Sequence, residues 1–187
     1  MKQARALILI DGSNFYFKLR DLQLHHLLSF DFAKFASFLA RKETVARATY
    51  YVGAVRTDGT EKTNTMLANQ QRLFAHLKKH KITYSLGYLL KSDGVFHEKG
   101  VDVNIAVDML VATYENVADT IYLVSSDTDL LPAIKKAQEK GKSVVYVGFS
   151  HKLSTAMVAN CRETRTLTSD DLLPFIQVQK QSSKKVA

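Results

Sequence analysis

The chain has 187 residues, 46% of them hydrophobic and 24% charged, which suits one well-buried globular domain and is too short to assume two. Its single cysteine, Cys161, excludes an internal disulfide. Its first apolar run, residues 7–10, is too short for a signal peptide or a membrane span. We therefore expect a cytoplasmic protein. The net charge of +8 excludes an acidic surface and favours a polyanionic partner, although modestly basic proteins are common.

Apolar runs and helical patterns alternate along the chain. Strand patterns cover residues 5–11, 48–55, 82–90, 95–96, 120–126, 143–149 and 164–167. Helical patterns cover a segment through Phe15, Leu19 and Leu22, and residues 32–39, 61–79, 100–114, 129–140, 150–159 and 170–175. Asp31 is a candidate helix cap, residues 91–94 are typical of a hairpin turn, and Gly141 stands where a helix should end.

This alternation predicts an α/β fold in which a mainly parallel sheet is covered by helices on both faces. We expect residues 1–176 to form one domain and residues 177–187 to be a basic, disordered tail. In such folds ligands bind beyond the carboxyl ends of the strands, where the strand order reverses. Asp11 and Asp127 directly follow predicted strands, so both should lie at that edge of the sheet.

The first candidate site residue is Asp11, which is followed by a small polar turn. A carboxylate at the end of an apolar strand is costly unless something stabilises it, and a divalent metal is the simplest partner. In this interpretation Asp11 binds the metal, and Ser13 and Asn14 position a substrate phosphate at the helix start. The alternative is that Asp11 merely caps a helix or shapes a turn.

Asp127 and Asp129 are the second candidates, at the end of another apolar run. Either residue could cap the helix that follows, yet a cap needs one acid and this segment has two. Ser125 is expected to orient the carboxylates. Metal binding and capping therefore both stay open for this pair.

The third acidic element is the helix of residues 100–114, which is apolar nearly all round and is therefore predicted to be buried. Asp102 and Asp108 should lie about 120° apart around the helix and about 9 Å apart along it, so they should not share one metal. We expect Asp102 to bind the metal. We expect Asp108 to have a structural role or to hold the metal-binding residues in place without contacting the metal. Lys99 is a candidate for holding a phosphate, with a solvated lysine as the alternative.

Three acidic elements at one edge of a sheet point to Mg²⁺ or Mn²⁺ acting on a phosphodiester. The six histidines form no tight ligand pair beyond the adjacent His25 and His26, which argues against a structural zinc site. The chain has no P-loop and no glycine-rich dinucleotide fingerprint, which disfavours an NTPase or a dehydrogenase.

Together these segments resemble an NYN domain, a LabA-like member of the PIN-like nuclease superfamily. The matching segments are Ile10-Asp11-Gly-Ser-Asn14-Phe-Tyr16, Lys99-Gly-Val-Asp102-Val-Asn-Ile-Ala-Val-Asp108-Met-Leu110 and Val124-Ser-Ser-Asp127-Thr-Asp129-Leu-Leu-Pro132, closed by Gly141 and Val147-Gly148-Phe149. Their order and spacing match over about residues 5–150. The third segment departs from the family pattern at Ser126, where glycine is usual, and at Leu130, where phenylalanine is usual, and it keeps every acid.

The resemblance implies a three-layer α/β/α PIN-like (Rossmann-like) fold and a metal-dependent ribonuclease. The implied catalytic and metal-binding residues are Asp11, Asp102, Asp127 and Asp129. In this hypothesis Asp129 completes the metal shell or orients the attacking water. RNA is the expected partner, no membrane is expected, and a homodimer is left open. Tyr16 or Phe15 is a candidate for stacking on a base, with a core role favoured for Phe15.

Two other function classes compete with the ribonuclease. One is a non-catalytic RNA-binding or regulatory module that keeps the acids for structure or for a bound ion. The other is a small-molecule phosphohydrolase, but haloacid-dehalogenase-like enzymes have a second acid two residues after the first, where this chain has Ser13.

Overall fold

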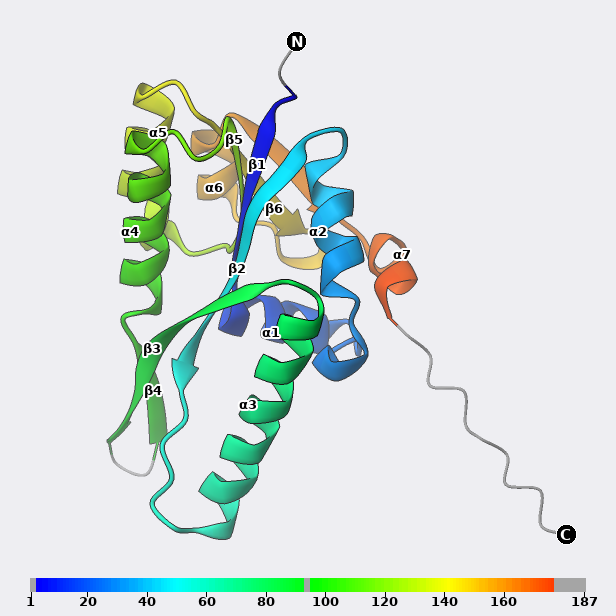
Figure 1. Cartoon of the computed structure of the whole chain (residues 1–187), viewed down its shortest axis with the longest axis vertical. Coiled ribbons are helices and arrows are strands. Elements are labelled where there is room, and N and C mark those ends of the chain that lie inside the picture. The colour runs from blue at the N-terminus through cyan, green and yellow to red at the C-terminus, as the bar shows by residue number, and fades with distance from the viewer. Residues whose placement is uncertain (1–2, 93–94, 177–187) are drawn as a thin grey trace, which may run out of the picture.

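The structure, a computed structural model, describes residues 3–92 and 95–176. At its centre is a seven-stranded sheet with the order β4-β3-β2-β1-β5-β6-β7 (Figure 1). The strands are β1 (Arg5–Asp11), β2 (Thr44–Ala54), β3 (Thr83–Ser92), β4 (Val95–Lys99), β5 (Thr120–Val124), β6 (Ser143–Phe149) and β7 (Glu163–Leu167). Neighbouring strands are parallel except β3 and β4, which are antiparallel. The predicted mainly parallel sheet is therefore confirmed.

Helices cover both faces of this sheet. The α-helices are α1 (Gly12–Asp21), α2 (Phe32–Ala40), α3 (Glu61–Lys79), α4 (Val101–Tyr114), α5 (Leu131–Glu139), α6 (Thr155–Asn160) and α7 (Ser169–Leu172). Short 3-10 segments are η1 (Leu27–Ser29), η2 (Thr128–Leu130), η3 (Ser150–Lys152) and η4 (Leu173–Phe175). Figure 1 shows α4 and α5 on one side of the sheet and α2 on the other.

Two hydrophobic cores lie on the two faces of the sheet, because successive side chains of a strand point to opposite faces. In β1, Ile8 and Ile10 belong to the core that α1, α2, α3 and α7 cover. Leu7 and Leu9 belong to the core that α4, α5 and α6 cover. All four of these side chains are fully buried, so β1 is the central strand of a three-layer α/β/α fold, as expected.

Several predicted boundaries need correction. β2 begins at Thr44 rather than at residue 48, because Thr44 already pairs with Arg5 of β1. The helix predicted over residues 150–159 is split into η3 and α6, since the backbone at Leu153 is extended and Ser154 caps α6. The helix predicted over residues 129–140 begins as the 3-10 segment η2, which Asp127 caps, and becomes α5 only at Leu131.

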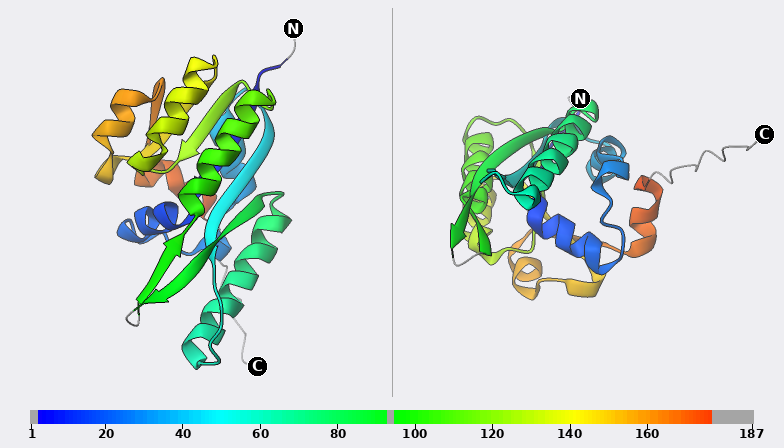
Figure 2. Two further views of the ribbon diagram at one scale, coloured as in Figure 1. Left: turned by 90° about the vertical axis from the view of Figure 1, so that its left-hand side faces the viewer. Right: turned by 90° about the horizontal axis from the view of Figure 1, so that it is seen from below.

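The prediction that residues 100–114 form a helix buried all round is wrong. Val101, Ile105 and Met109 of α4 are buried, but Val103 and Val107 are 63% and 51% exposed. The helix packs on the sheet with one side only, and Figure 2 (left) shows it lying across the outside of the sheet. Burial of its acids therefore depends on where each residue lies around the helix.

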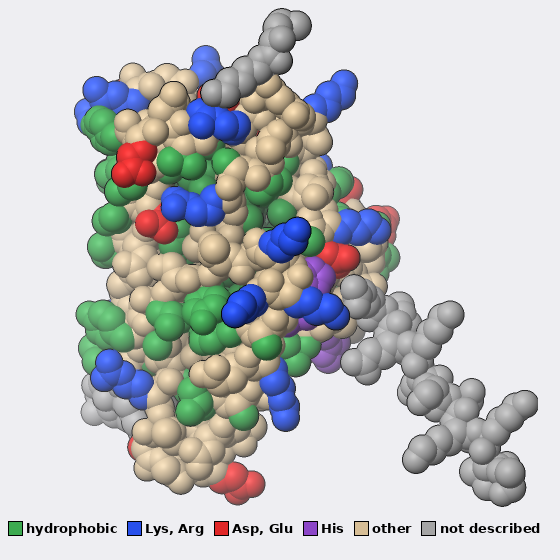
Figure 3. Space-filling model, viewed as in Figure 1, with side chains coloured by type: hydrophobic (Ala, Val, Ile, Leu, Met, Phe, Trp, Pro, Cys, Tyr) green, Lys and Arg blue, Asp and Glu red, His purple; other side chains and the backbone are tan. Residues whose placement is uncertain are grey.

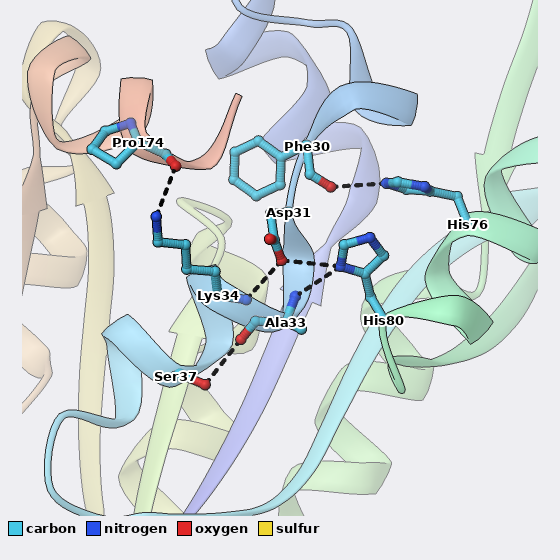
Figure 4. Close-up of polar contacts among 8 residues, drawn as sticks. All are labelled: Phe30, Asp31, Ala33, Lys34, Ser37, His76, His80 and Pro174. Carbon is cyan, nitrogen blue, oxygen red and sulfur yellow. Dashed lines mark hydrogen bonds and ion pairs between the residues drawn. The ribbon is translucent and has the colours of Figure 1, made fainter. Parts of the chain in front are cut away.

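The C-terminal half of α3 is tied to the segment that leads into α2 (Figure 4). The His76 ring donates a hydrogen bond to the carbonyl oxygen of Phe30 at 2.8 Å, and His80 Nδ1 lies 3.1 Å from Asp31 Oδ1. The same Asp31 oxygen accepts the Lys34 N–H at 2.9 Å, so Asp31 caps α2 as predicted. These contacts fix α3 against a segment that is distant in the sequence.

The outer surface mixes apolar and basic side chains. Figure 3 shows hydrophobic side chains gathered over β3, where Leu86 and Tyr88 are exposed, and Lys and Arg side chains spread over the same face. No helix in the described part of the chain is both long and apolar enough to cross a membrane. Residues 93–94 of the predicted hairpin turn and the predicted tail, residues 177–187, lie outside the described residues.

Candidate active site

The strand order reverses between β1 and β5. From β1 the chain continues to β2 and β3 on one side of the sheet, whereas β6 and β7 follow β5 on the other side. The two strands are parallel neighbours, with Ile10 opposite Val124. Asp11 is the last residue of β1, and Ser125 directly follows β5. Asp11 and the residues after β5 therefore meet at the carboxyl end of the sheet, where α/β folds bind ligands.

Asp11 is a buried carboxyl group that also caps a helix. Its side chain is 5% exposed, Oδ1 accepts the Asn14 N–H at 3.0 Å, and Oδ2 accepts the Ser125 hydroxyl at 2.8 Å. The pKa of Asp11 is raised to about 6. Burial is the main cause and the negative charges of Asp102 and Glu98 add to it, while these two hydrogen bonds act in the opposite direction. Capping alone would not need so complete a burial or so many neighbouring acids.

Gly12 allows α1 to begin directly behind Asp11. A Cβ atom at Gly12 would lie 2.4 Å from a ring carbon of Tyr50 and 2.5 Å from the carbonyl oxygen of Tyr51. The Tyr50 hydroxyl also donates to the Gly12 carbonyl oxygen at 3.1 Å. The first turn of α1, including the half-buried Ser13 and Asn14, is thus held tightly against β2.

Ser125 connects Asp11 to the second acidic segment. While its hydroxyl donates to Asp11, the same oxygen accepts the Asp127 N–H at 3.1 Å. Asp127 in turn accepts the Asp129 N–H with Oδ1 at 2.9 Å and so caps η2. Asp127 is half-buried and Asp129 is exposed. Of the two acids, Asp127 is the one that caps, and the Asp129 carboxylate is not used for that purpose.

Asp102 comes to this site from the first turn of α4. It is half-buried, and burial raises its pKa, with further increases from the charges of Asp127, Glu98 and Asp129. The negative charge of Asp102 in turn raises the pKa of Asp11. Five carboxylates therefore interact through their charges, and we call them the acidic site: Asp11, Glu98, Asp102, Asp127 and Asp129.

Glu98 is the member of the acidic site that the sequence analysis missed. It lies on β4, and its Oε2 accepts the backbone N–H of Gly53 at 2.6 Å. A Cβ atom at Gly53 would lie 2.9 Å from that oxygen, so the glycine leaves room for the acid. The predicted strand ended at residue 96, whereas β4 continues through Lys99. A longer strand pattern, with Glu98 directly before the Lys99-Gly100 motif, is the signal that could have found it.

Asp108 lies further along α4 and contacts a different group. It accepts the Tyr51 hydroxyl at 2.7 Å, and Tyr51 is the residue opposite Asp11 in the pairing of β1 with β2. The structure therefore connects Asp108 to Asp11 only through the strand beside it. Lys99 is the exposed last residue of β4.

The two departures from the family pattern have local explanations. The Ser126 hydroxyl shares a hydrogen bond of 2.9 Å with the Tyr146 hydroxyl, which also accepts the Ser154 N–H at 3.1 Å. Leu130 is 1% exposed and packs in the core beneath α4 and α5. Neither departure removes a group from the acidic site.

The acids do not form a closed cage. Among the residues that the structure describes, no three His, Cys, Asp or Glu side chains are grouped closely enough to hold a metal ion by themselves. In the same described residues, the strongest influences on the pKa values of Asp11 and Asp102 include several acids and no lysine or arginine. The acidic site is therefore an open, negatively charged edge.

A three-layer α/β/α fold with acids at the carboxyl ends of its two central strands is that of the PIN-like class. The chain belongs to the NYN domain family, whose pattern it matches over residues 5–168. NYN domains have a nuclease-like fold of this class.

Two similar proteins carry names that state no function. A stretch of 57 residues is 46% identical to an uncharacterized protein of Methanocaldococcus jannaschii, covering 30% of this chain and 24% of that protein. A crystal structure of a protein of unknown function from Vibrio parahaemolyticus superimposes with a TM-score of 0.67 at 22% identity, covering 91% of this chain and 98% of that one. The structural likeness supports the fold alone.

Proposed function

We propose that this protein is a ribonuclease that depends on Mg²⁺ or Mn²⁺ and hydrolyses phosphodiester bonds of RNA at the acidic site. The observation that carries the proposal is the buried Asp11, whose pKa is raised by burial and by the neighbouring acids Asp102 and Glu98. Perturbed acids gathered at the edge where α/β folds bind ligands are typical of functional sites. The nuclease-like fold of the NYN family supports the same conclusion.

The donor set fits a hard divalent cation. Carboxylate oxygens are the ligands that Mg²⁺ and Mn²⁺ prefer, and histidine or cysteine ligands are not needed. Mg²⁺ keeps several of its waters and is commonly bound by one or two carboxylates together with substrate phosphate. The open arrangement of these acids therefore suits a cation that is completed by water and by RNA.

Asp11, Asp102 and Asp127 are the residues that would hold the cation, with Asp129 completing the shell or orienting the attacking water. A bound cation would stabilise negative charge on the phosphodiester and make a coordinated water more acidic. Ser125 keeps the Asp11 carboxylate in place with its 2.8 Å hydrogen bond. Ser13, Asn14 and Lys99 would position the scissile phosphate from the start of α1 and the end of β4.

The overall charge supports a polyanionic substrate. The chain carries 26 Lys and Arg against 18 Asp and Glu. Because five of those acids are concentrated in the acidic site, the remaining surface is more basic than the net charge indicates. A basic surface around an acidic edge binds the phosphate backbone of a nucleic acid, while the acids and their cation act on a single phosphodiester bond.

The test is cleavage of a pool of labelled structured and single-stranded RNAs with Mn²⁺, Mg²⁺ or EDTA. Wild type should cleave only with a divalent cation, and Asp11→Asn should reduce cleavage to the EDTA level. Asp170→Asn is the matched control, because Asp170 is an exposed acid in α7 far from the acidic site along the chain. Circular dichroism should show all three proteins folded.

A non-catalytic RNA-binding module is the second candidate, and the capping roles of Asp11 and Asp127 favour it. In that case the folded wild type would retain RNA without cleaving it under any metal. Hydrolysis of a small phosphate ester with no activity on RNA would instead support a phosphohydrolase.

A further inference from the structure

A cavity of about 820 Å³ lies beside α1, on the side of the sheet opposite α4. Its walls come from α1, from residues 25–29, from α3 and from Ile176, and they include Tyr16, His25, Asn69 and Gln70. Figure 2 (right) shows α1 (blue) and α3 (teal) next to each other. Residues of both helices and of the loop after α1 line the cavity. A cavity of this size is in the range that holds a small organic group.

Hydrogen bonds at the end of β2 connect the lining of the cavity to the acidic site. Gln70, which lines the cavity, donates to the Gly53 carbonyl oxygen at 2.8 Å and accepts the Val55 N–H at 2.9 Å. The N–H of the same Gly53 donates to Glu98 of the acidic site. One residue of β2 thus contacts a cavity residue and an acid at the same time.

α1 makes a second connection between them. Asp11 caps this helix, and Tyr16 projects into the cavity from its second turn. Tyr16 follows Asp11 by five residues, which is about 7.5 Å along the helix axis. Burial raises the pKa of the Tyr50 hydroxyl, and the charges of Asp11, Glu98 and Tyr16 raise it further, so Tyr16 lies near two of the acids. A nucleotide whose phosphate is at Asp11 can therefore direct a base toward Tyr16.

The lining has the chemistry of a base-binding pocket. The Tyr16 ring lies edge-on to His25 with centroids 5.9 Å apart, and His25 stacks on His26 at 4.9 Å. These planar rings offer stacking surfaces, and Asn69 offers amide groups to the edge of a base. His25 Nδ1 is a buried nitrogen with no hydrogen-bond partner among the described residues. Planar rings with a few polar groups suit a nucleobase better than a purely apolar ligand.

The cavity is present before any ligand binds. The His76 contact with Phe30 and the His80 contact with Asp31 hold α3 against the residues that directly follow the cavity-lining loop, residues 25–29 (Figure 4). Phe15, the neighbour of Tyr16, is fully buried among Phe30 and Phe35. The rings that could stack are therefore carried by fixed backbone, which reduces the entropy lost on binding.

We propose that this cavity binds one nucleobase of a single-stranded RNA whose adjacent phosphate lies at the acidic site, with Tyr16 and His25 stacking on the base and Asn69 contacting its edge. The proposal rests on the ribonuclease function proposed above, and it adds single-stranded RNA as the substrate class. A duplex would keep its bases paired and stacked inside, where they cannot enter the cavity.

The test uses binding rather than cleavage. Fluorescence anisotropy with Ca²⁺, which also binds carboxylate oxygens, measures the affinity of the full chain for a labelled 12-nucleotide single-stranded RNA, and for a series in which one ribose at a time lacks its base. Loss of a stacked base should weaken binding about 10-fold or more at one position and much less elsewhere. Tyr16→Ala should weaken binding of the intact RNA similarly and abolish the difference between positions, while Tyr16→Phe should keep it.

Phe17→Ala is the matched control, because Phe17 is a 49% exposed ring on the same helix that does not line the cavity. It should leave the position dependence unchanged. Equal affinity for every abasic RNA, measured with wild type, would overturn the proposal even if the Tyr16 variants failed to fold. Metal-dependent cleavage with equal abasic affinities would retain the ribonuclease and reject the base pocket. A position-dependent loss without any cleavage would retain the pocket and reject the ribonuclease.

Discussion

Ser125 donates its hydroxyl hydrogen to Asp11 at 2.8 Å and thereby joins the end of β5 to the end of β1. Both residues are buried, at 1% and 5% exposure. The bond crosses the position where the strand order reverses, which is where this fold class binds ligands. Ser125 therefore holds Asp11 and, through the Asp127 N–H, the segment that carries Asp127 and Asp129.

Ser125→Ala should lower both stability and activity. The change leaves a buried carboxylate oxygen and the Asp127 N–H without their shared partner, which costs about 1–3 kcal/mol of unfolding free energy. It also removes a bond that lowers the pKa of Asp11, so that pKa should rise and cleavage should need a higher pH. Urea unfolding and pH–rate profiles measure the two effects. Ser126→Ala, which loses only the Tyr146 contact, should leave the profile unshifted, and identical profiles for wild type and Ser125→Ala would contradict this role.

Asp11→Asn should make the metal-free protein more stable at neutral pH. The pKa of Asp11 is raised from 3.8 to about 6 in the folded chain, so its contribution to stability is full below the unfolded value and is lost as pH rises through about 6. Compared with low pH, where Asp11 is protonated, its ionisation lowers the free energy of unfolding by up to about 3 kcal/mol at pH 8. Asparagine stays neutral, so in EDTA the variant should gain in melting temperature over wild type between about pH 4 and pH 8. A difference that does not vary with pH would contradict the assignment, and Asp170→Asn, at an exposed position in α7, is the control variant.

Glu98→Gln should weaken divalent-cation binding while keeping the fold. Glutamine retains an oxygen that can accept the Gly53 N–H, but the change removes one negative charge that acts on Asp11 and Asp102. We expect Mn²⁺ affinity to fall by roughly several-fold, as for the loss of a nearby charge in a partly solvated site. Isothermal titration calorimetry measures this change. Glu115→Gln, an exposed acid at the far end of α4, should leave the affinity unaltered, and an equal effect of both variants would rule out a specific role for Glu98.

Gly12→Ala should disturb the first turn of α1. The added Cβ atom would meet Tyr50 and the backbone of Tyr51 at 2.4 and 2.5 Å, so helix or strand must move. Overpacking of this kind typically costs about 1–3 kcal/mol of unfolding free energy. Thermal unfolding measures the loss, and Ser13→Ala at the adjacent half-buried position should cost much less. A Gly12→Ala protein as stable as wild type would mean that α1 tolerates a shift away from β2.

Local sequence patterns correctly predicted the helices and strands whose apolar residues have a clear spacing. β1, α3 and β6 have the predicted bounds, because their apolar spacing matches a strand or a helix period and polar or glycine residues end it. Asp11, Asp102 and Asp127 were identified as candidates since each acid stands in an apolar segment, where it needs a partner. Their catalytic and metal-binding roles remain predictions that the proposed variants test.

Contacts between distant segments were not visible in those patterns. α4 has apolar residues on every side, so its sequence could not indicate that Val103 and Val107 face outward; the packing of the helix on the sheet decides that. Glu98 joins the acidic site only because β4 pairs antiparallel with β3 and because Gly53 leaves room for it. The cavity beside Tyr16 likewise exists only because α1 and α3 are brought together.

By itself, the sequence determined the α/β class, the order of most strands and helices, and the acids that need stabilisation, because each of these follows from the spacing and burial preference of nearby residues. Only the tertiary structure decided which acids interact through their charges, that Ser125 bridges Asp11 and Asp127, and that a cavity forms beside α1. The reason is physical: charge interactions, hydrogen bonds and cavities depend on distances between atoms, and strand register and helix packing set those distances.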